Sequence, residues 1–214
     1  MGTSSSGRRA RGKGGSEPSG TESKPPRAKP RVNSRRKGVS FEEKIAREFR
    51  QIYDPPELLA SLAEAAKAKG AGSVAAYRAI LKTSRVRRSD QGRGAMEPDL
   101  VIQGCPLWLE LQHARAVTPR GKLEQAERDA ATAESSLRPV AVIHETGRWL
   151  TQAWMRFSTL LYLAGFDDLT DSEGEAIPLT EAPGAALAVM LDYEDLLARL
   201  RFREEVRCAA PEAD

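Results

Sequence analysis

The chain is poor in cysteine and in long apolar runs. Its 214 residues include two cysteines, Cys105 and Cys208, which are too few and too scattered for a disulfide framework or a zinc site. No apolar run approaches the roughly 18 residues that a membrane span needs, and the N-terminus lacks the apolar core of a signal peptide. These absences predict an intracellular protein, cytoplasmic or nucleoid-associated, with no membrane partner.

The first 37 residues are also poor in large apolar side chains and in acidic residues. Residues 1–37 carry 11 Lys and Arg against two acidic residues, a net charge of +9, whereas the whole chain is +3 and residues 38–214 therefore carry −6. A segment so rich in Gly, Ser, Pro and Arg cannot bury enough surface to offset its ordering entropy, which predicts a disordered tail. Basic arms of this kind bind nucleic acid through phosphate contacts; the alternative is a solubilising tail or a leftover leader.

The centre of the chain, residues 96–113, is typical of two short strands joined by a tight turn at residues 104–106. Apolar and polar residues alternate after the turn, so Glu110 and Gln112 share one face of the second strand and three leucines share the other. If the turn is centred on its first two residues, the numbers of paired residues sum to 209, and Asp99 lies opposite Glu110. Directly opposed side chains have Cβ atoms about 4.5–5.5 Å apart.

Two carboxylates at that distance repel each other unless a cation lies between them. Magnesium is held by one or two carboxylates, with water and phosphate oxygens in the remaining positions. The spacing therefore favours a site for Mg²⁺, with Mn²⁺ able to substitute, at Asp99 and Glu110. The alternative is that Asp99 only serves the turn chemistry after Pro98 and that Glu110 faces water.

A helix is predicted to open the fold at residues 40–53. Ser40 and Glu43 have the spacing of a capping box, and an apolar stripe follows on one face of the helix. That stripe consists of Phe41, Ile45, Phe49 and Ile52. Glu42 is not needed for the cap and lies beside the stripe, where it can point into the edge of a site or, as a favourable charge near the helix N-terminus, into solvent.

Further periodic segments predict an alternation of helices and strands. Helices are predicted at residues 57–69 and 73–82, and together they form an insertion at 55–84. A further helix is predicted after Thr118-Pro119, and its inward residues are Leu123, Ala126, Ala130, Ala133 and Leu137. The remaining predicted elements are a central strand 139–144, a strand 149–155, a helix 156–164, a loop 165–184, a strand 185–191 and a helix 192–203.

A basic, glycine-containing loop at residues 85–94 leads directly into Asp99. Arginine suits bidentate phosphate contacts, and glycine lets a backbone approach a polyanion closely. The position of the loop beside the carboxylates favours a phosphate-binding role over an ordinary solvated loop.

In order along the chain, these motifs resemble the PD-(D/E)xK nuclease superfamily, and within it the archaeal and phage type of Holliday-junction resolvase. The segment 36–38 precedes Glu42 as in the start of that family, where the helix glutamate belongs to the metal site. The segments 97–99 and 110–112 match its other catalytic pair, and 124–126 matches a recurring piece of the following helix. The resemblance extends over roughly residues 36 to 160.

The resemblance implies a restriction-endonuclease-like α/β fold, a mixed sheet flanked by helices, for the domain expected over residues 38–206. Residues 207–214 are expected to form a disordered end. It implies a Mg²⁺-dependent endonuclease that cuts branched or duplex DNA, acts as a homodimer and is encoded by a cell or a phage. The implied catalytic residues are Glu42, Asp99, Glu110 and Gln112, the metal ligands are Asp99, Glu110 and Glu42, and the DNA-binding residues are Arg85, Arg87, Arg88, Arg93, Arg36 and Lys37.

One departure concerns Gln112, which stands where the family usually has a lysine that polarises water or stabilises developing charge. Glutamine supplies no charge, but its amide can orient a water or bind phosphate. Three alternatives therefore stay open. They are another nuclease of the superfamily, a DNA-binding protein whose nuclease site has decayed, and an unrelated α/β domain. Strand alternation puts His113 on the opposite face from Gln112. The interface of a dimer could be formed by Trp149 and Trp154 or by the last two helices.

Overall fold

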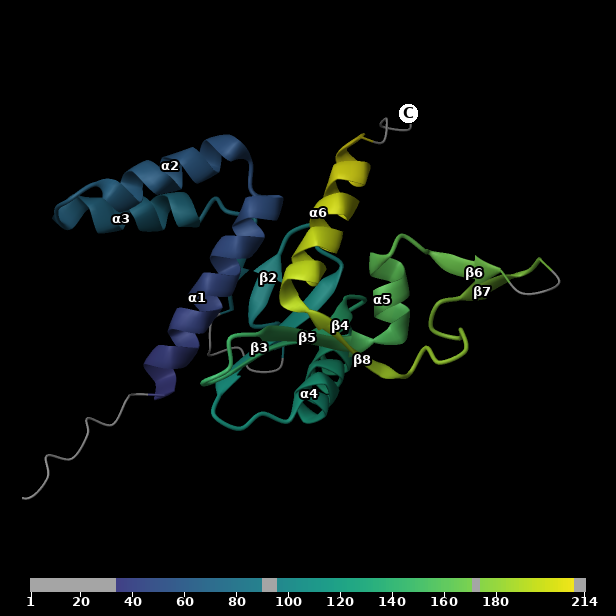
Figure 1. The fold of residues 1–214 in the computed structure, drawn as a ribbon. Helices are drawn as coiled ribbons and strands as arrows, with labels where there is room; N and C mark the ends of the chain where they lie inside the picture. The colour runs from purple at the N-terminus through teal and green to yellow at the C-terminus, as the bar shows by residue number, and fades with distance from the viewer. Residues whose placement is uncertain (1–33, 90–95, 171–173, 210–214) are drawn as a thin grey trace, which may run out of the picture. The chain divides into compact units, whose positions relative to one another are not determined.

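A mixed sheet of six strands lies at the centre of the computed structural model, which describes residues 34–89, 96–170 and 174–209 (Figure 1). From one edge to the other the strands are β1 (Val86–Arg88), β2 (Leu100–Ile102), β3 (Leu107–Ala114), β4 (Arg138–Glu145), β5 (Thr151–Arg156) and β8 (Ala188–Asp192). β3 and β4 are parallel, and all other neighbours are antiparallel. The prediction of an α/β protein with a mixed sheet and flanking helices is confirmed.

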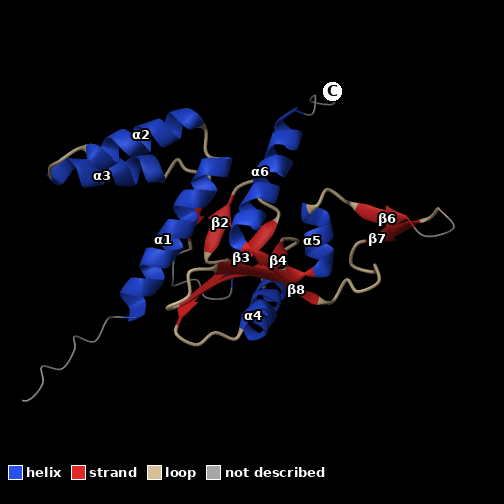
Figure 2. Ribbon diagram, in the orientation of Figure 1, coloured by secondary structure: helices blue, strands red, loops and turns tan. Residues whose placement is uncertain are grey.

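Helices cover both faces of this sheet, with α4 on one side and α1 and α6 on the other (Figure 2). The helices of the described residues are α1 (Ser34–Tyr53), α2 (Pro56–Lys67), α3 (Ala71–Leu81), α4 (Pro119–Thr132), α5 (Phe157–Leu163) and α6 (Tyr193–Ala209). Two further strands, β6 (Asp168–Thr170) and β7 (Ala176–Pro178), pair with each other in a small separate sheet.

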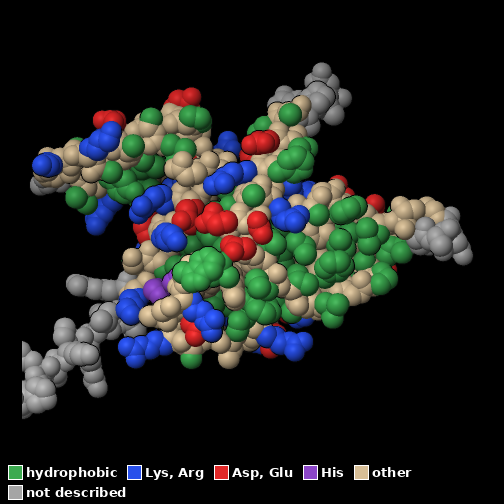
Figure 3. Space-filling model, viewed as in Figure 1, with side chains coloured by type: hydrophobic (Ala, Val, Ile, Leu, Met, Phe, Trp, Pro, Cys, Tyr) green, Lys and Arg blue, Asp and Glu red, His purple; other side chains and the backbone are tan. Residues whose placement is uncertain are grey.

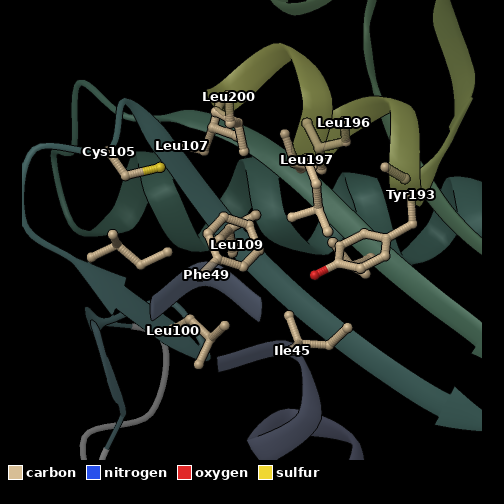
Figure 4. Packing of buried hydrophobic residues seen from close by; sticks show 14 of the residues in the cluster. Ile45, Phe49, Leu100, Cys105, Leu107, Leu109, Tyr193, Leu196, Leu197 and Leu200 are labelled. Atoms are coloured by element: carbon tan, nitrogen blue, oxygen red, sulfur yellow. The ribbon is translucent and has the colours of Figure 1, made fainter. Parts of the chain in front are cut away.

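The main core lies between the sheet and the helices α1 and α6 (Figure 4). The predicted apolar stripe of the first helix is confirmed, since three of its four members are buried and the fourth, Ile52, is half-buried against them. Fully buried members of this core include Ile45, Phe49, Leu100, Leu109, Leu196 and Leu197. Burial of each such side chain contributes about 1.5–3 kcal/mol, so this core holds β2 and β3 firmly against α1.

The helix α4 covers the opposite face. Three of its predicted inward residues, Leu123, Ala126 and Ala130, are buried, and Thr118 is the N-cap residue that the sequence predicts. Because alanine is small, the helix lies close enough for Trp108 to pack against both alanines. This packing sets the residues on the α4 side of β3 directly under the first turns of α4.

The first helix begins earlier than predicted. α1 starts at Ser34, so Ser40 lies inside the helix and the predicted capping box is wrong. Glu43 instead accepts a hydrogen bond from Arg50 Nη1 at 2.8 Å, two turns further on. Arginine and lysine are good helix formers, and Gly38 costs only about 1 kcal/mol against alanine, so the helix continues back through these residues.

The helical insertion is closed at its base by one buried carboxylate. Asp54 Oδ2 accepts a hydrogen bond from Ser84 Oγ at 2.6 Å, and Asp54 Oδ1 accepts one from the Arg85 backbone N–H at 2.7 Å. The two ends of the insertion therefore meet beside β1. The helices α2 and α3 extend away from the sheet and pack mainly on each other (Figure 1).

Three other boundaries differ from the prediction. Residues 86–88 of the predicted basic loop form β1, because they pair with β2. The predicted loop at 165–184 contains the β6–β7 hairpin. α6 continues to Ala209 and so includes residues 207–209 of the end that was predicted to be disordered. The predicted disordered tail at 1–37 lies outside the described residues except for its last four, which belong to α1. None of the described helices has the length and apolar character needed to cross a membrane.

Candidate functional site

The hairpin of β2 and β3 has the register that the sequence predicts. Leu100 pairs with Leu109, so the numbers of paired residues sum to 209 and Asp99, one residue before β2, stands beside Glu110. Asp99 Oδ2 accepts a hydrogen bond from the Leu111 backbone N–H at 2.7 Å, which fixes its carboxylate against β3. The two predicted carboxylates therefore meet on the α4 side of the sheet.

A cation from α4 lies between these carboxylates. Lys122 Nζ is 2.7 Å from Glu110 Oε2 and 3.9 Å from Asp99 Oδ2. The side chains of Glu110 and Lys122 are 6% and 13% exposed, whereas that of Asp99 is 37% exposed, so an incoming group meets Asp99 first. The sequence argument that two such carboxylates need a cation between them is met in the structure by this ammonium group.

Glu110 is held at both of its oxygens. Trp108 Nε1 donates a hydrogen bond to Oε1 at 3.2 Å, and Lys122 binds Oε2. Burial raises the pKa of Glu110, and the like charge of Asp99 raises it further, while the donors from Lys122 and Trp108 act in the opposite direction. A carboxylate with a raised pKa beside a second carboxylate is typical of functional sites.

The donor set fits a divalent cation of the Mg²⁺ type. Asp99 and Glu110 supply two carboxylates. Gln112, on the same face of β3 as Glu110, has a buried Oε1 that lacks a hydrogen-bond partner within the described part of the chain. Carboxylate and amide oxygens are ligands that hard cations accept. Over the part of the chain that the structure describes, no group of three or more His, Cys, Asp or Glu side chains could hold a metal, so the fit rests on two carboxylates and one amide.

Glu42 does not join this group. Arg88 donates to Glu42 Oε2 through both Nε, at 2.9 Å, and Nη2. Because Arg88 pairs directly with Leu100, it points to the face of the sheet that α1 covers, whereas Lys122 approaches from the α4 side. The expected convergence of three carboxylates is therefore not found among residues 34–89, 96–170 and 174–209, and we remove Glu42 from the candidate metal ligands.

The predicted DNA-binding residues are also divided. Arg87 donates two hydrogen bonds to Glu97, at 3.1 and 3.2 Å, and Arg88 is engaged by Glu42. Arg85 directly precedes β1 and is exposed, and Lys37 lies on α1. Arg93 and the side chain of Arg36 fall outside what the structure describes. The basic residues near Asp99 thus balance acidic partners rather than standing as a free cluster.

Lys122 is the member of the candidate site that the sequence analysis missed. It precedes Leu123, the first buried residue of α4, so its place on the flank of the inward face was a usable signal. It lies 12 residues from Glu110, and the loop between β3 and α4 hides that proximity.

Comparison with known proteins gave no assignment. No protein-family model matches the chain, and no curated protein is significantly similar to it.

We expect Glu110→Gln to raise the free energy of unfolding near pH 7. The pKa of Glu110 is raised in the folded state, so the folded protein binds this proton more tightly and loses stability as pH rises from the ordinary value of the carboxyl to the raised one. Glutamine has no carboxyl proton to lose, and Asp99, whose Oδ2 lies 3.9 Å from Lys122 Nζ in the parent, remains as a partner for the ammonium group. Thermal unfolding measured from about pH 4 to pH 8 tests this, since each 1 kcal/mol shifts Tm by about 2–4 °C. A difference in Tm that does not grow with pH contradicts the expected titration.

Proposed function

We propose that this protein is a metal-dependent DNA endonuclease of the restriction-endonuclease-like fold, acting on branched DNA such as four-way junctions. The observation that supports it most is the convergence of Asp99, Glu110 and Lys122 on one face of the β2–β3 hairpin. Two carboxylates and one ammonium group, with Gln112 on the same face, are the groups that phosphodiester hydrolysis uses. The order of these residues along the chain agrees with the resemblance noted from the sequence.

Asp99, Glu110 and the amide oxygen of Gln112 would hold Mg²⁺. A bound Mg²⁺ ion supplies a hydroxide nucleophile at neutral pH and offsets charge on the scissile phosphate. The protein groups prepare that site: the Leu111 N–H orients Asp99, and Trp108 and Lys122 orient Glu110. The raised pKa of Glu110 predicts that activity falls at acidic pH, because the carboxyl must be ionised to act as a ligand.

Lys122 takes the place of the lysine that is missing from β3. Its ammonium group lies beside both carboxylates, where it can stabilise the negative charge that develops on a phosphate, or orient the attacking water. Gln112 then serves as a neutral ligand of the Mg²⁺ site. The site keeps a positive charge, from Lys122, although glutamine stands where the family pattern has lysine.

Binding to DNA rests on phosphate contacts, which position the protein without reading sequence. The net charge of +9 on residues 1–37 supplies such contacts, so affinity falls steeply with salt. A junction has two symmetry-related strands to cut, so we propose a homodimer. Trp149, which is 91% exposed, is a candidate anchor for that interface.

The second candidate is a protein of the same fold that binds DNA without cutting it. Two observations favour it: Lys122 already offsets part of the charge of the carboxylate pair, and Glu42 is bound by Arg88. Tight junction binding with no cleavage in Mg²⁺ or Mn²⁺ would support this candidate.

The test is a comparison of a four-way junction with linear duplexes of the same sequence. We expect the full chain to nick the junction in Mg²⁺ or Mn²⁺, to leave the linear duplex largely intact, and to be inactive in EDTA. Cleavage of both substrates at similar rates would indicate another nuclease rather than a resolvase. Cleavage of neither, with binding retained, would favour the second candidate.

A further inference from the structure

The two histidines of the chain lie side by side at the ends of two parallel strands. His113 on β3 pairs with His144 on β4, and their ring centroids are 5.1 Å apart. Phe41 of α1 packs against both rings, with centroid distances of 5.5 and 5.9 Å. The pair therefore lies on the α1 side of the sheet, on the opposite face from Glu110 and Gln112.

These rings line a pocket of about 510 Å³ whose ionisable groups are all basic. Lys37, Ser40 and Lys44 of α1 form one wall, the two histidines form another, and Thr146 follows β4. Among the residues that the structure describes, no carboxylate lines the pocket. In Figure 3 the histidine surface (purple) adjoins Lys and Arg surface (blue) on the face shown. A hollow with two lysines, two imidazoles and two hydroxyls is suited to an anion.

The imidazole nitrogens have few partners of their own. His113 Nδ1 is buried and has no hydrogen-bond partner among the described residues, and His144 Nδ1 is 3.1 Å from Thr151 Oγ1. A buried polar atom without a partner costs free energy, so a ligand that supplies one is favoured. No hydrogen bond or ion pair in the described part of the chain joins either ring to a carboxylate.

The charges around the pair favour an anion there. Burial lowers the pKa of His144, and the neighbouring His113 and Lys44 lower it further. Two acidic residues lie nearby, and each has a basic partner. Glu48 Oε1 is 3.8 Å from Lys44 Nζ on α1, and Glu145 Oε2, at the end of β4, is 2.7 Å from Arg148 Nε. An anion in the pocket would offset the positive charge of the lysines and stabilise protonated imidazole.

We propose that this pocket binds a phosphate group. The source of the phosphate rests on the proposed function: if the protein cuts DNA, the group is a backbone phosphate of DNA that lies across the end of β3. His113 directly follows Gln112 on that strand, so the pocket opens one residue beyond the carboxylate site and on the other face of the sheet. On this proposal, a DNA strand that turns around the end of β3, as at a branch point, contacts both places. A free phosphate or phosphate monoester has the same chemistry.

The imidazole signals give a direct test, because a spectrum of ¹⁵N-histidine-labelled protein contains only two imidazole rings. The full chain is titrated with pH in sodium chloride, in inorganic phosphate at the same ionic strength, and with a four-way junction. The DNA arm uses the Asp99→Asn variant and omits Mg²⁺, so that no cleavage occurs. We expect both phosphate and DNA to shift the imidazole signals and to raise the pKa of His144.

Lys44→Gln is the main variant, because this exposed side chain can be replaced without disturbing the core. We expect it to weaken phosphate binding severalfold and to lower the slope of log affinity for DNA against log salt by about 1. Lys67→Gln on α2, also exposed and paired at 2.9 Å with Glu64, is the matched control and should change neither. His144→Gln should weaken phosphate binding as well.

Four outcomes decide the matter. A response to both probes supports the pocket and its DNA source. A response to DNA alone also supports it, with inorganic phosphate too weak to compete. A response to phosphate alone supports the phosphate pocket and overturns its assignment to DNA. Signals that respond to neither probe, or equally in Lys44→Gln and the parent, overturn the proposal. Cleavage is measured separately, so a nuclease without this pocket and a pocket without nuclease activity are distinguished.

Discussion

Replacing Asp99 by asparagine is expected to reduce DNA cleavage by about 10³-fold or more while leaving DNA affinity unchanged or higher. The carboxylate is 37% exposed and is the member of the pair that an incoming phosphate meets first. Asparagine has nearly the same size, and its carbonyl oxygen can still accept the hydrogen bond from the Leu111 N–H. The substitution therefore removes a negative charge and little else, and the repulsion between that charge and a phosphate disappears.

Single-turnover cleavage of a four-way junction measures the first effect, and fluorescence anisotropy without Mg²⁺ measures the second. Asp167→Asn is a suitable control, because this carboxylate is 81% exposed and lies 3.6 Å from Arg203 Nη2, in a segment after α5. We expect the control to cut and bind as the parent does. If Asp99→Asn loses binding and cleavage to the same extent, the carboxylate contributes to affinity or folding and has no catalytic role.

The second large effect is expected from Lys122→Met, which keeps most of the side-chain volume and removes the charge. Cleavage should fall by about 10²–10³-fold, because a donor to the developing charge is lost. The variant should also unfold more easily, by about 3 kcal/mol near neutral pH, because Glu110 and Asp99 are left beside each other without a cation. We place this estimate at the lower end of the usual range because Asp99 is partly exposed.

The stability loss has a predictable pH dependence. Lys122 is one of the groups that lower the pKa of Glu110, so its removal raises that pKa further. Since a raised carboxyl pKa costs stability only where the unfolded chain is ionised, the loss should shrink toward acidic pH, where Glu110 binds a proton in both states. Thermal unfolding of the variant and the parent at about pH 4 and pH 8 measures this difference.

Two further variants complete the test: one keeps the charge at position 122, and the other is a control on the exposed side of α4. Lys122→Arg should recover much of the stability, because the positive charge remains. Arg128→Met, on an exposed position of the same helix, should leave stability and cleavage unchanged. Full activity in Lys122→Met would remove this residue from the proposed site and favour a site that uses the two carboxylates alone.

The part of the site that lies within one hairpin could be predicted from the sequence. The turn residues and the period-2 alternation fix the register of β2 against β3, and Leu100 opposite Leu109 is the pairing that the spacing predicts. The stripe on the first helix and the inward alanines of α4 also follow from periodicity. These features depend on residues that are close together in the chain, so the sequence alone is enough to predict them.

Elements whose pairing is distant were predicted less well. β1 has only three residues and forms because β2 lies beside it, which its basic sequence does not suggest. The first helix extends back to Ser34, and the last helix extends on to Ala209, because helix ends depend on weak local preferences. The ion pair of Arg88 with Glu42 spans 46 residues and could not be read from spacing.

The sequence by itself determined the α/β class, the hairpin, and the meeting of Asp99 with Glu110, because strand alternation and turn chemistry act between near neighbours. Only the tertiary structure decided which cation lies between those carboxylates and where Glu42 goes. Lys122 reaches them because α4 crosses the sheet above β3, and Glu42 turns to Arg88 because β1 presents that side chain to α1. Both outcomes depend on how helices pack on a sheet, and opposite charges then pair wherever that packing brings them within reach.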